Sequence, residues 1–185
     1  SLGRGEDAIA VLEEVVRLSR GVLGPGHPET LGAMSNLGTR YQFSGQIDKA
    51  TSLFEELLRL SQQHLGAAHT ITIGAMKKLG SIYAQQGRHD EFFQLRDKAF
   101  ERLQAALGPN HPETLRQLRD LADIYGSRNR FDRAIPMHEE ALTRSEIAFG
   151  ATHYDTLTCM THLGRDYLRA GHFHQGVAVL EDALV

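Results

Sequence analysis

Apolar side chains recur along the chain at the three- and four-residue spacings of an α-helix. Leu31, Met34, Leu37 and Tyr41 are separated by three, three and four positions, and the next segment repeats this kind of spacing. Residues so separated share one helix face, so both segments are predicted to be amphipathic helices. The same pattern predicts helices over residues 6–21, 28–43, 47–63, 70–85, 89–105, 112–127, 131–147, 154–169 and 173–185.

The pattern repeats with a period of 42 residues. Each copy carries a histidine shortly after Leu-Gly or Phe-Gly and three residues before a threonine: His27, His69, His111 and His153. A fixed period of this length is typical of proteins in which successive helix pairs stack on one another. We therefore predict an all-α fold, a superhelical solenoid of antiparallel helix pairs, without a sheet.

The residues between the predicted helices fit short helical turns. Gly45, Gly87, Asn129 and Gly171 stand where the first helix of each pair should end, and these residue types best tolerate the left-handed backbone conformation of a helix C-terminus. The registered histidines are predicted to be structural, each completing the turn between repeats and the start of the next helix.

Two motifs resemble a known family. Leu37-Gly38-x-x-Tyr41, followed by Ala50 and Phe54, resembles the tetratricopeptide repeat. The 42-residue period with its Leu-Gly-Pro-x-His-Pro-x-Thr-Leu phrase is similar to the kinesin light chain variety of that repeat. The resemblance implies a tetratricopeptide-type solenoid over nearly the whole chain.

The register divides the chain into parts of one array. We expect a half repeat over 1–27, repeats over 28–69, 70–111 and 112–153, and a partial repeat over 154–185. Both ends fall inside a repeat in this register, so the chain is expected to be a fragment of a longer array. Phe92 occupies the register of the small residues Ala50, Ala134 and Gly176, and is expected to widen the second pair or rotate its outer helix.

The resemblance implies a peptide-binding groove, since the first helix of each tetratricopeptide pair lines the concave face. The residues predicted to face this groove are Asn36, Thr39, Lys77, Lys78, Arg116, Arg119, His162, Arg165 and Arg169. Most are cationic, so an acidic or C-terminal-carboxylate peptide of a protein partner is the expected ligand. The alternative is a solvated helix face with incidental charge.

Composition and net charge argue against several classes of function. The 185 residues are 41% hydrophobic and 23% charged, as in a folded soluble chain, and the formal charge of −3 gives no general attraction to nucleic acid or an anionic membrane. No apolar run approaches the length of a membrane span. The single cysteine, Cys159, excludes internal disulfides and Cys-rich zinc modules, which mildly favours a reducing cytoplasm.

The sequence shows no pattern of an enzyme or of a cofactor site. It has no Gly-rich phosphate loop, no His-Glu-x-x-His and no nucleophile elbow. Metal binding is not expected, because the registered histidines should be separated by the thickness of a helix pair, and His172-x-His174 is interpreted as surface loop. Cys159 is expected to be a partly buried structural thiol and not a nucleophile.

We therefore predict a non-catalytic protein-protein interaction scaffold. The alternative is a regulatory or self-associating spacer of a larger multidomain signalling protein, associating through the open ends of the array.

Overall fold

The described part of the chain consists of α-helices joined by short turns. The computed structural model describes the backbone of residues 2–184 and the side chains of residues 7–184, so Ser1 and Val185, at the limits of the predicted first and last repeats, lie outside the described residues. Within 2–184 there are nine helices and no strand: α1 (Leu2–Leu23), α2 (Pro28–Phe43), α3 (Ile47–His64), α4 (Thr70–Gln85), α5 (His89–Leu107), α6 (Pro112–Ser127), α7 (Phe131–Phe149), α8 (Tyr154–Arg169) and α9 (Phe173–Asp182).

The helix bounds confirm the periodicity argument. Helices α2, α4, α6 and α8 have the predicted limits, and α3, α5 and α7 run one or two residues further than predicted. None of the helices in the described part is both long and apolar enough to cross a bilayer. The chain divides between Arg102 and Leu103, inside α5, into two compact units.

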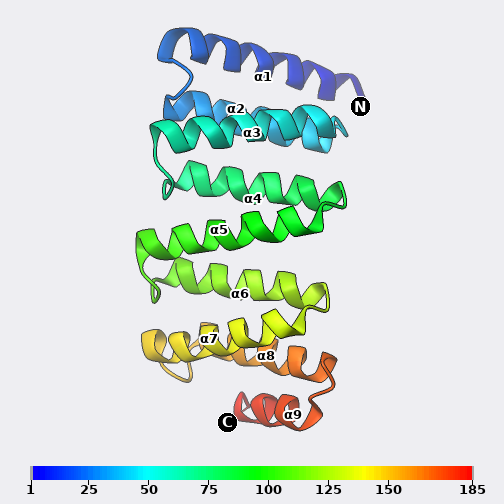
Figure 1. The fold of residues 1–185 in the computed structure, drawn as a ribbon, viewed down its shortest axis with the longest axis vertical. Helices are drawn as coiled ribbons and strands as arrows, with labels where there is room; N and C mark the ends of the chain where they lie inside the picture. The colour runs from blue at the N-terminus through cyan, green and yellow to red at the C-terminus, as the bar shows by residue number, and fades with distance from the viewer. Residues whose placement is uncertain (1, 185) are drawn as a thin grey trace. The chain divides into compact units, whose positions relative to one another are not determined.

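The first unit is a stack of antiparallel helices. Helix α1 packs on α2, α2 on α3 and α3 on α4, while α2 also contacts α4 directly (Figure 1). The largest side chains of its core, Leu31, Met34, Phe54 and Leu57, are almost completely buried. Thus each helix contributes its apolar face to a core that it shares with its neighbours.

The second unit repeats this arrangement. Helix α6 packs on α7, α7 on α8 and α8 on α9, and α6 contacts α8. Ile135, Leu163 and Tyr167 form one buried cluster of its core, with Phe131 and Val179 packed against it. In both units the first helices of successive pairs therefore touch each other and form an inner layer, consisting of α2 and α4 in one unit and α6 and α8 in the other.

The registered histidines cap the inner-layer helices. Each imidazole Nδ1 accepts a hydrogen bond from the backbone N–H two residues later, over 3.1 to 3.3 Å, and the acceptors are His27, His69, His111 and His153. The first N–H groups of a helix have no intrahelical partner, so this contact satisfies one of them. The structure confirms the predicted structural role of these four residues.

The turns inside the pairs have the predicted backbone conformation. Gly45, Gly87 and Gly171 have φ values of 78°, 76° and 84°, and Asn129 has a φ of 57°. Positive φ is costly for most side chains, which explains the choice of glycine or asparagine at these helix ends.

Three registered tyrosines link neighbouring helix pairs. The hydroxyls of Tyr41, Tyr83 and Tyr167 each donate to a glutamate 28 residues earlier in the chain, namely Glu13, Glu55 and Glu139. Burial, followed by the contact with the carboxylate, raises the pKa of Tyr41 and of Tyr167 to about 12. These phenols therefore stay neutral donors at physiological pH.

The packing beside Gly80 differs from the packing beside Gly38, while the expected widening or rotation of the second pair stays a prediction. A Cβ added at Gly38 would lie 2.7 Å from the ring of Phe54, whereas one added at the equivalent Gly80 would find its nearest neighbour, the Phe92 ring, at 3.5 Å. The space beside Gly80 is thus larger than the space beside Gly38. A cleft of about 420 Å³ lies between α3, α4 and α5, and Leu58, Tyr83 and Leu95 form part of its wall.

We expect His111→Ala to lower the free energy of unfolding by about 1 kcal/mol, since it removes a helix cap. Denaturant unfolding followed by circular dichroism measures this. His172→Ala is the matched control, because His172 precedes α9 without capping it. Equal losses from the two variants would contradict the capping role.

We expect Gly38→Ala to destabilise the protein by about 1–2 kcal/mol, because overpacking against the buried Phe54 ring outweighs the better helix propensity of alanine. Gly80→Ala should be neutral or stabilise by up to ~1 kcal/mol, since alanine fits there in ordinary contact. Thermal unfolding of both variants tests the difference, and a Gly80→Ala loss as large as that of Gly38→Ala would rule it out.

Candidate functional site

The residues predicted to face a groove lie on the inner-layer helices of both units. Asn36 and Thr39 are on α2, and Lys77 and Lys78 are on α4. In the second unit, α6 carries Arg116 and Arg119, and α8 carries His162, Arg165 and Arg169.

In the first unit the inner layer presents exposed polar side chains. Asn36 and Lys78 are exposed, and neither makes an ion pair or a side-chain hydrogen bond with any residue the structure describes. The hydroxyl of Thr39 donates to the carbonyl of Ser35 in its own helix. Gln42 donates to Gln85 over 3.1 Å, which joins the adjacent edges of α2 and α4.

In the second unit the predicted cations are largely paired within the protein. Arg116 binds Glu113 over 2.6 Å and Arg119 binds Asp155 over 3.3 Å. Arg169 donates to the Asn129 side chain over 3.1 Å. Although the sequence predicts a positive strip, much of its charge in this unit is neutralised by neighbouring carboxylates.

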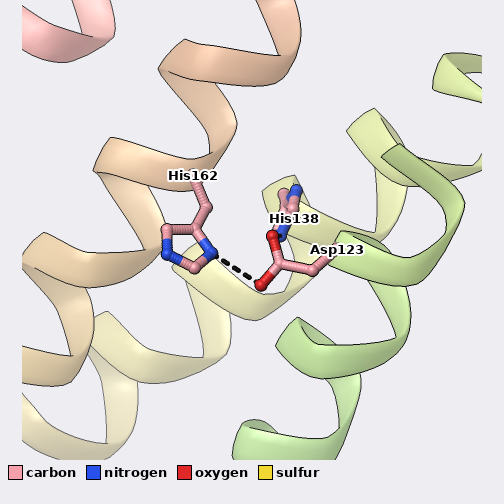
Figure 2. A group of neighbouring side chains, drawn as sticks. All are labelled: Asp123, His138 and His162. Atoms are coloured by element: carbon pink, nitrogen blue, oxygen red, sulfur yellow. Dashed lines mark ion pairs between the residues drawn. The ribbon is translucent and has the colours of Figure 1, made fainter. Parts of the chain in front are cut away.

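Arg165 and His162 belong to a polar cluster that joins three helices. Arg165 Nη2 lies 2.5 Å from Asp123 Oδ1, and His162 Nδ1 lies 2.9 Å from Asp123 Oδ2. Both contacts join side chains of α8 to the Asp123 carboxylate of α6. Figure 2 shows His162 of α8, Asp123 of α6 and His138 of α7 converging on one point.

His138 is the most buried member of this cluster. Its side chain and that of Asp166 are both 0% exposed, and its Nδ1 lies 3.0 Å from Asp166 Oδ2. Its other ring nitrogen, Nε2, lies 3.6 Å from Asp123 Oδ1 and has no hydrogen-bond partner. A Cβ added at Gly126 would lie 2.8 Å from Asp166 Oδ2, so the glycine leaves room for this carboxylate.

The charges around Asp123 keep it ionised. Burial by itself raises the pKa of Asp123, but the neighbouring His162, Arg165 and His138 outweigh burial and leave the pKa below its ordinary value. Asp123 is therefore a carboxylate anion at neutral pH, half-buried at the edge of the inner layer.

Sequence reasoning predicted His162 and Arg165 but missed His138 and Asp166. A signal was present in the 42-residue register. His138 stands where other copies hold Phe54, Arg96 and Leu180, and Asp166 stands where they hold Arg40, Ile82 and Ile124. The signal is weak, because each position is apolar in at least two of the other copies but holds an arginine in another.

Cys159 is more completely buried than the sequence predicts. Its side chain lies next to Ser145, with 3.6 Å between Sγ and Oγ. Burial raises the pKa of the Cys159 thiol, so it is a poor nucleophile at neutral pH.

Comparison with known proteins agrees with this architecture. The sequence profile of the family described as "Tetratricopeptide repeat" matches residues 1–63, 72–147 and 128–184. No curated protein sequence matches this chain.

Several solved structures share the fold. Nearly identical TPR-like repeats from a Podosopora anserina protein assigned to the kinesin light chains superpose with a TM-score of 0.81 at 23% identity, covering 98% of this chain and 86% of that one. BtubC (BKLC) from P. vanneervenii gives a TM-score of 0.76 at 23% identity, with 98% and 72% covered. MamA gives 0.60 at 18% identity, with 98% and 88% covered.

At these identities the solved structures show the fold alone. The family profile covers most of the chain, and the structural neighbours include kinesin light chain-like repeats. The chain belongs to the tetratricopeptide repeat family.

Proposed function

We propose that this chain is a non-catalytic interaction module that receives an extended, acidic segment of a partner protein along its inner-layer helices. Membership of the tetratricopeptide repeat family supports a protein-protein interaction scaffold. We also propose a cytoplasmic location, since the single, buried Cys159 requires no oxidising compartment.

The observation that carries the proposal is the pair of exposed, unengaged side chains Asn36 and Lys78 on contacting helices. An asparagine amide can both donate to and accept from the backbone of an extended peptide, and a lysine ammonium can bind a carboxylate. Because neither group is engaged within the protein, a partner can bind them without breaking an existing contact.

Two inner-layer arginines of the second unit differ from Lys78 because they already form ion pairs within the protein. Arg119 and Arg165 are already paired with Asp155 and Asp123, so an acidic ligand has to compete with those carboxylates. We therefore expect Lys78 to contribute more to binding an acidic peptide than either arginine does.

Lys78→Glu should weaken binding of an acidic peptide at least ~10-fold, about 1.4 kcal/mol, because attraction is replaced by repulsion. The probe is the best binder selected from a library of acidic peptides with free C-termini, measured by fluorescence polarisation. Lys98→Glu is the control, since it makes the same charge change on α5, beside the outer cleft. Equal weakening by both variants, or a library without enrichment of acidic sequences, would contradict the proposal.

Exposed apolar residues on α1 favour a second candidate function, self-association with another copy of this chain. Val11, Val15, Leu18 and Val22 are 63%, 40%, 49% and 81% exposed, and their spacing of four, three and four places them on one helix face. On α9, Phe173 and Val177 are likewise exposed. Such faces, brought together from two copies, would bury apolar surface that a monomer leaves in water.

Light scattering after size exclusion, over a range of concentrations, tests this second candidate. We expect a concentration-dependent dimer that Val15→Glu with Val22→Glu converts to a monomer. Ile147→Glu is the control, because Ile147 is 72% exposed on α7, away from that stripe. A chain that is monomeric at every concentration would exclude self-association.

A further inference from the structure

We propose that Asp123, His138 and His162 form a binding site for a divalent transition-metal ion of the zinc class. The site would join α6, α7 and α8 of the second unit, with water completing the coordination. It is separate from the peptide contacts proposed for Asn36 and Lys78, and it does not depend on them.

The three side chains present a suitable donor set at a suitable separation. One ligating atom of each lies within 4.8 Å of those of the other two. Two ligands of a tetrahedral ion with bonds of ~2.0–2.1 Å are roughly 3.3 Å apart. The 3.6 Å between His138 Nε2 and Asp123 Oδ1 is close to that value. His162 and Asp123 are only partly buried, so their side chains can turn to close the remaining distance.

The two imidazoles do not stack, and they do not hydrogen-bond to each other. Their rings lie perpendicular, with centroids 5.7 Å apart, on either side of the Asp123 carboxylate (Figure 2). His138 Nε2 is buried without a hydrogen-bond partner, and His162 Nδ1, which is also buried, has only its 2.9 Å contact with Asp123. Unpaired buried polar atoms are uncommon, and a metal ion would satisfy both nitrogens together.

Asp166 sets the orientation of His138. With a proton on Nδ1, His138 donates to Asp166 Oδ2 over 3.0 Å, which leaves a lone pair on Nε2 directed towards Asp123. Metal-binding histidines commonly donate their second ring N–H to a carboxylate in this way, which fixes the tautomer and raises the basicity of the ligating nitrogen. Asp166 is therefore a positioning residue for the site.

In the structure, the guanidinium of Arg165 pairs with the Asp123 carboxylate. It lies 2.5 Å from Asp123 Oδ1 and 3.6 Å from Asp166 Oδ1. The Arg165 side chain is 46% exposed, so it can swing outward when a metal ion takes Asp123. A donor set of two imidazoles and one carboxylate suits Zn²⁺ and its neighbours better than Mg²⁺ or Ca²⁺.

The competing arrangement is a protonated His138 held between Asp123 and Asp166, without any metal. Both arrangements use the same residues, so the test must detect the ion itself. We expect metal-stripped protein to bind one equivalent of Zn²⁺ per chain in calorimetric titration. Co²⁺ should give the intense visible absorption of a tetrahedral site.

Substitutions of single residues test whether the ion binds at this cluster. Asp123→Asn and His162→Asn should abolish the one-equivalent binding, and Asp166→Asn, which touches no metal, should weaken it 10–100-fold. The double variant His172→Ala with His174→Ala is the control, because it removes the other local histidine pair and should bind Zn²⁺ as the unaltered chain does. Circular dichroism confirms that each variant is folded.

Three results would overturn the proposal. They are the absence of one-equivalent Zn²⁺ binding by the unaltered chain, Zn²⁺ binding that persists unchanged in folded Asp123→Asn, and binding that is lost in the His172 and His174 double variant. The Co²⁺ spectrum of the unaltered chain is informative even if a variant fails to fold, since an octahedral spectrum would contradict the tetrahedral coordination expected for this site.

Discussion

Each helix of this protein depends on its neighbours to bury its apolar face. Isolated helices of 16 to 19 residues, the lengths of α2 to α8, are marginal in water, so contacts between helices have to supply most of their stability. Phe54 and Leu31 are completely buried because α2, α3 and α4 pack together. The positions that meet across helices are thus restricted to apolar or small residues, while exposed inner-layer positions such as Asn36 and Lys78 are not restricted by packing.

The cluster at His138 is the clearest departure from this constraint. A histidine and an aspartate, both completely buried, occupy positions that hold Phe54 and Ile82 in other copies. Burying polar groups is unfavourable unless they are paired, and the pairing is incomplete at His138 Nε2. Local inconsistency of this kind commonly marks a functional site, which is why the cluster, and not the registered histidines, directs attention to metal binding.

The fold could be predicted from the sequence because the period of 42 residues appears four times. The spacing of the apolar residues predicted most helix limits, and the glycines, asparagine and histidines at the helix ends predicted the turns and the caps. The cluster could not be predicted in the same way, since Asp123, His138 and His162 come from three helices and meet only after packing. The pairing of Arg119 with Asp155 likewise depends on side-chain directions that spacing does not determine. The expected positive strip is therefore partly neutralised, because arginines of α6 and α8 pair with nearby carboxylates.

The dependence of each pair on its neighbours is tested most directly by a peptide containing α2 and α3 alone, residues 28–64. Far-ultraviolet circular dichroism with a thermal scan should show a weakly helical peptide without a cooperative transition, because its apolar faces have no neighbouring pair to cover them. A monomeric peptide that is fully helical and melts cooperatively would contradict this account.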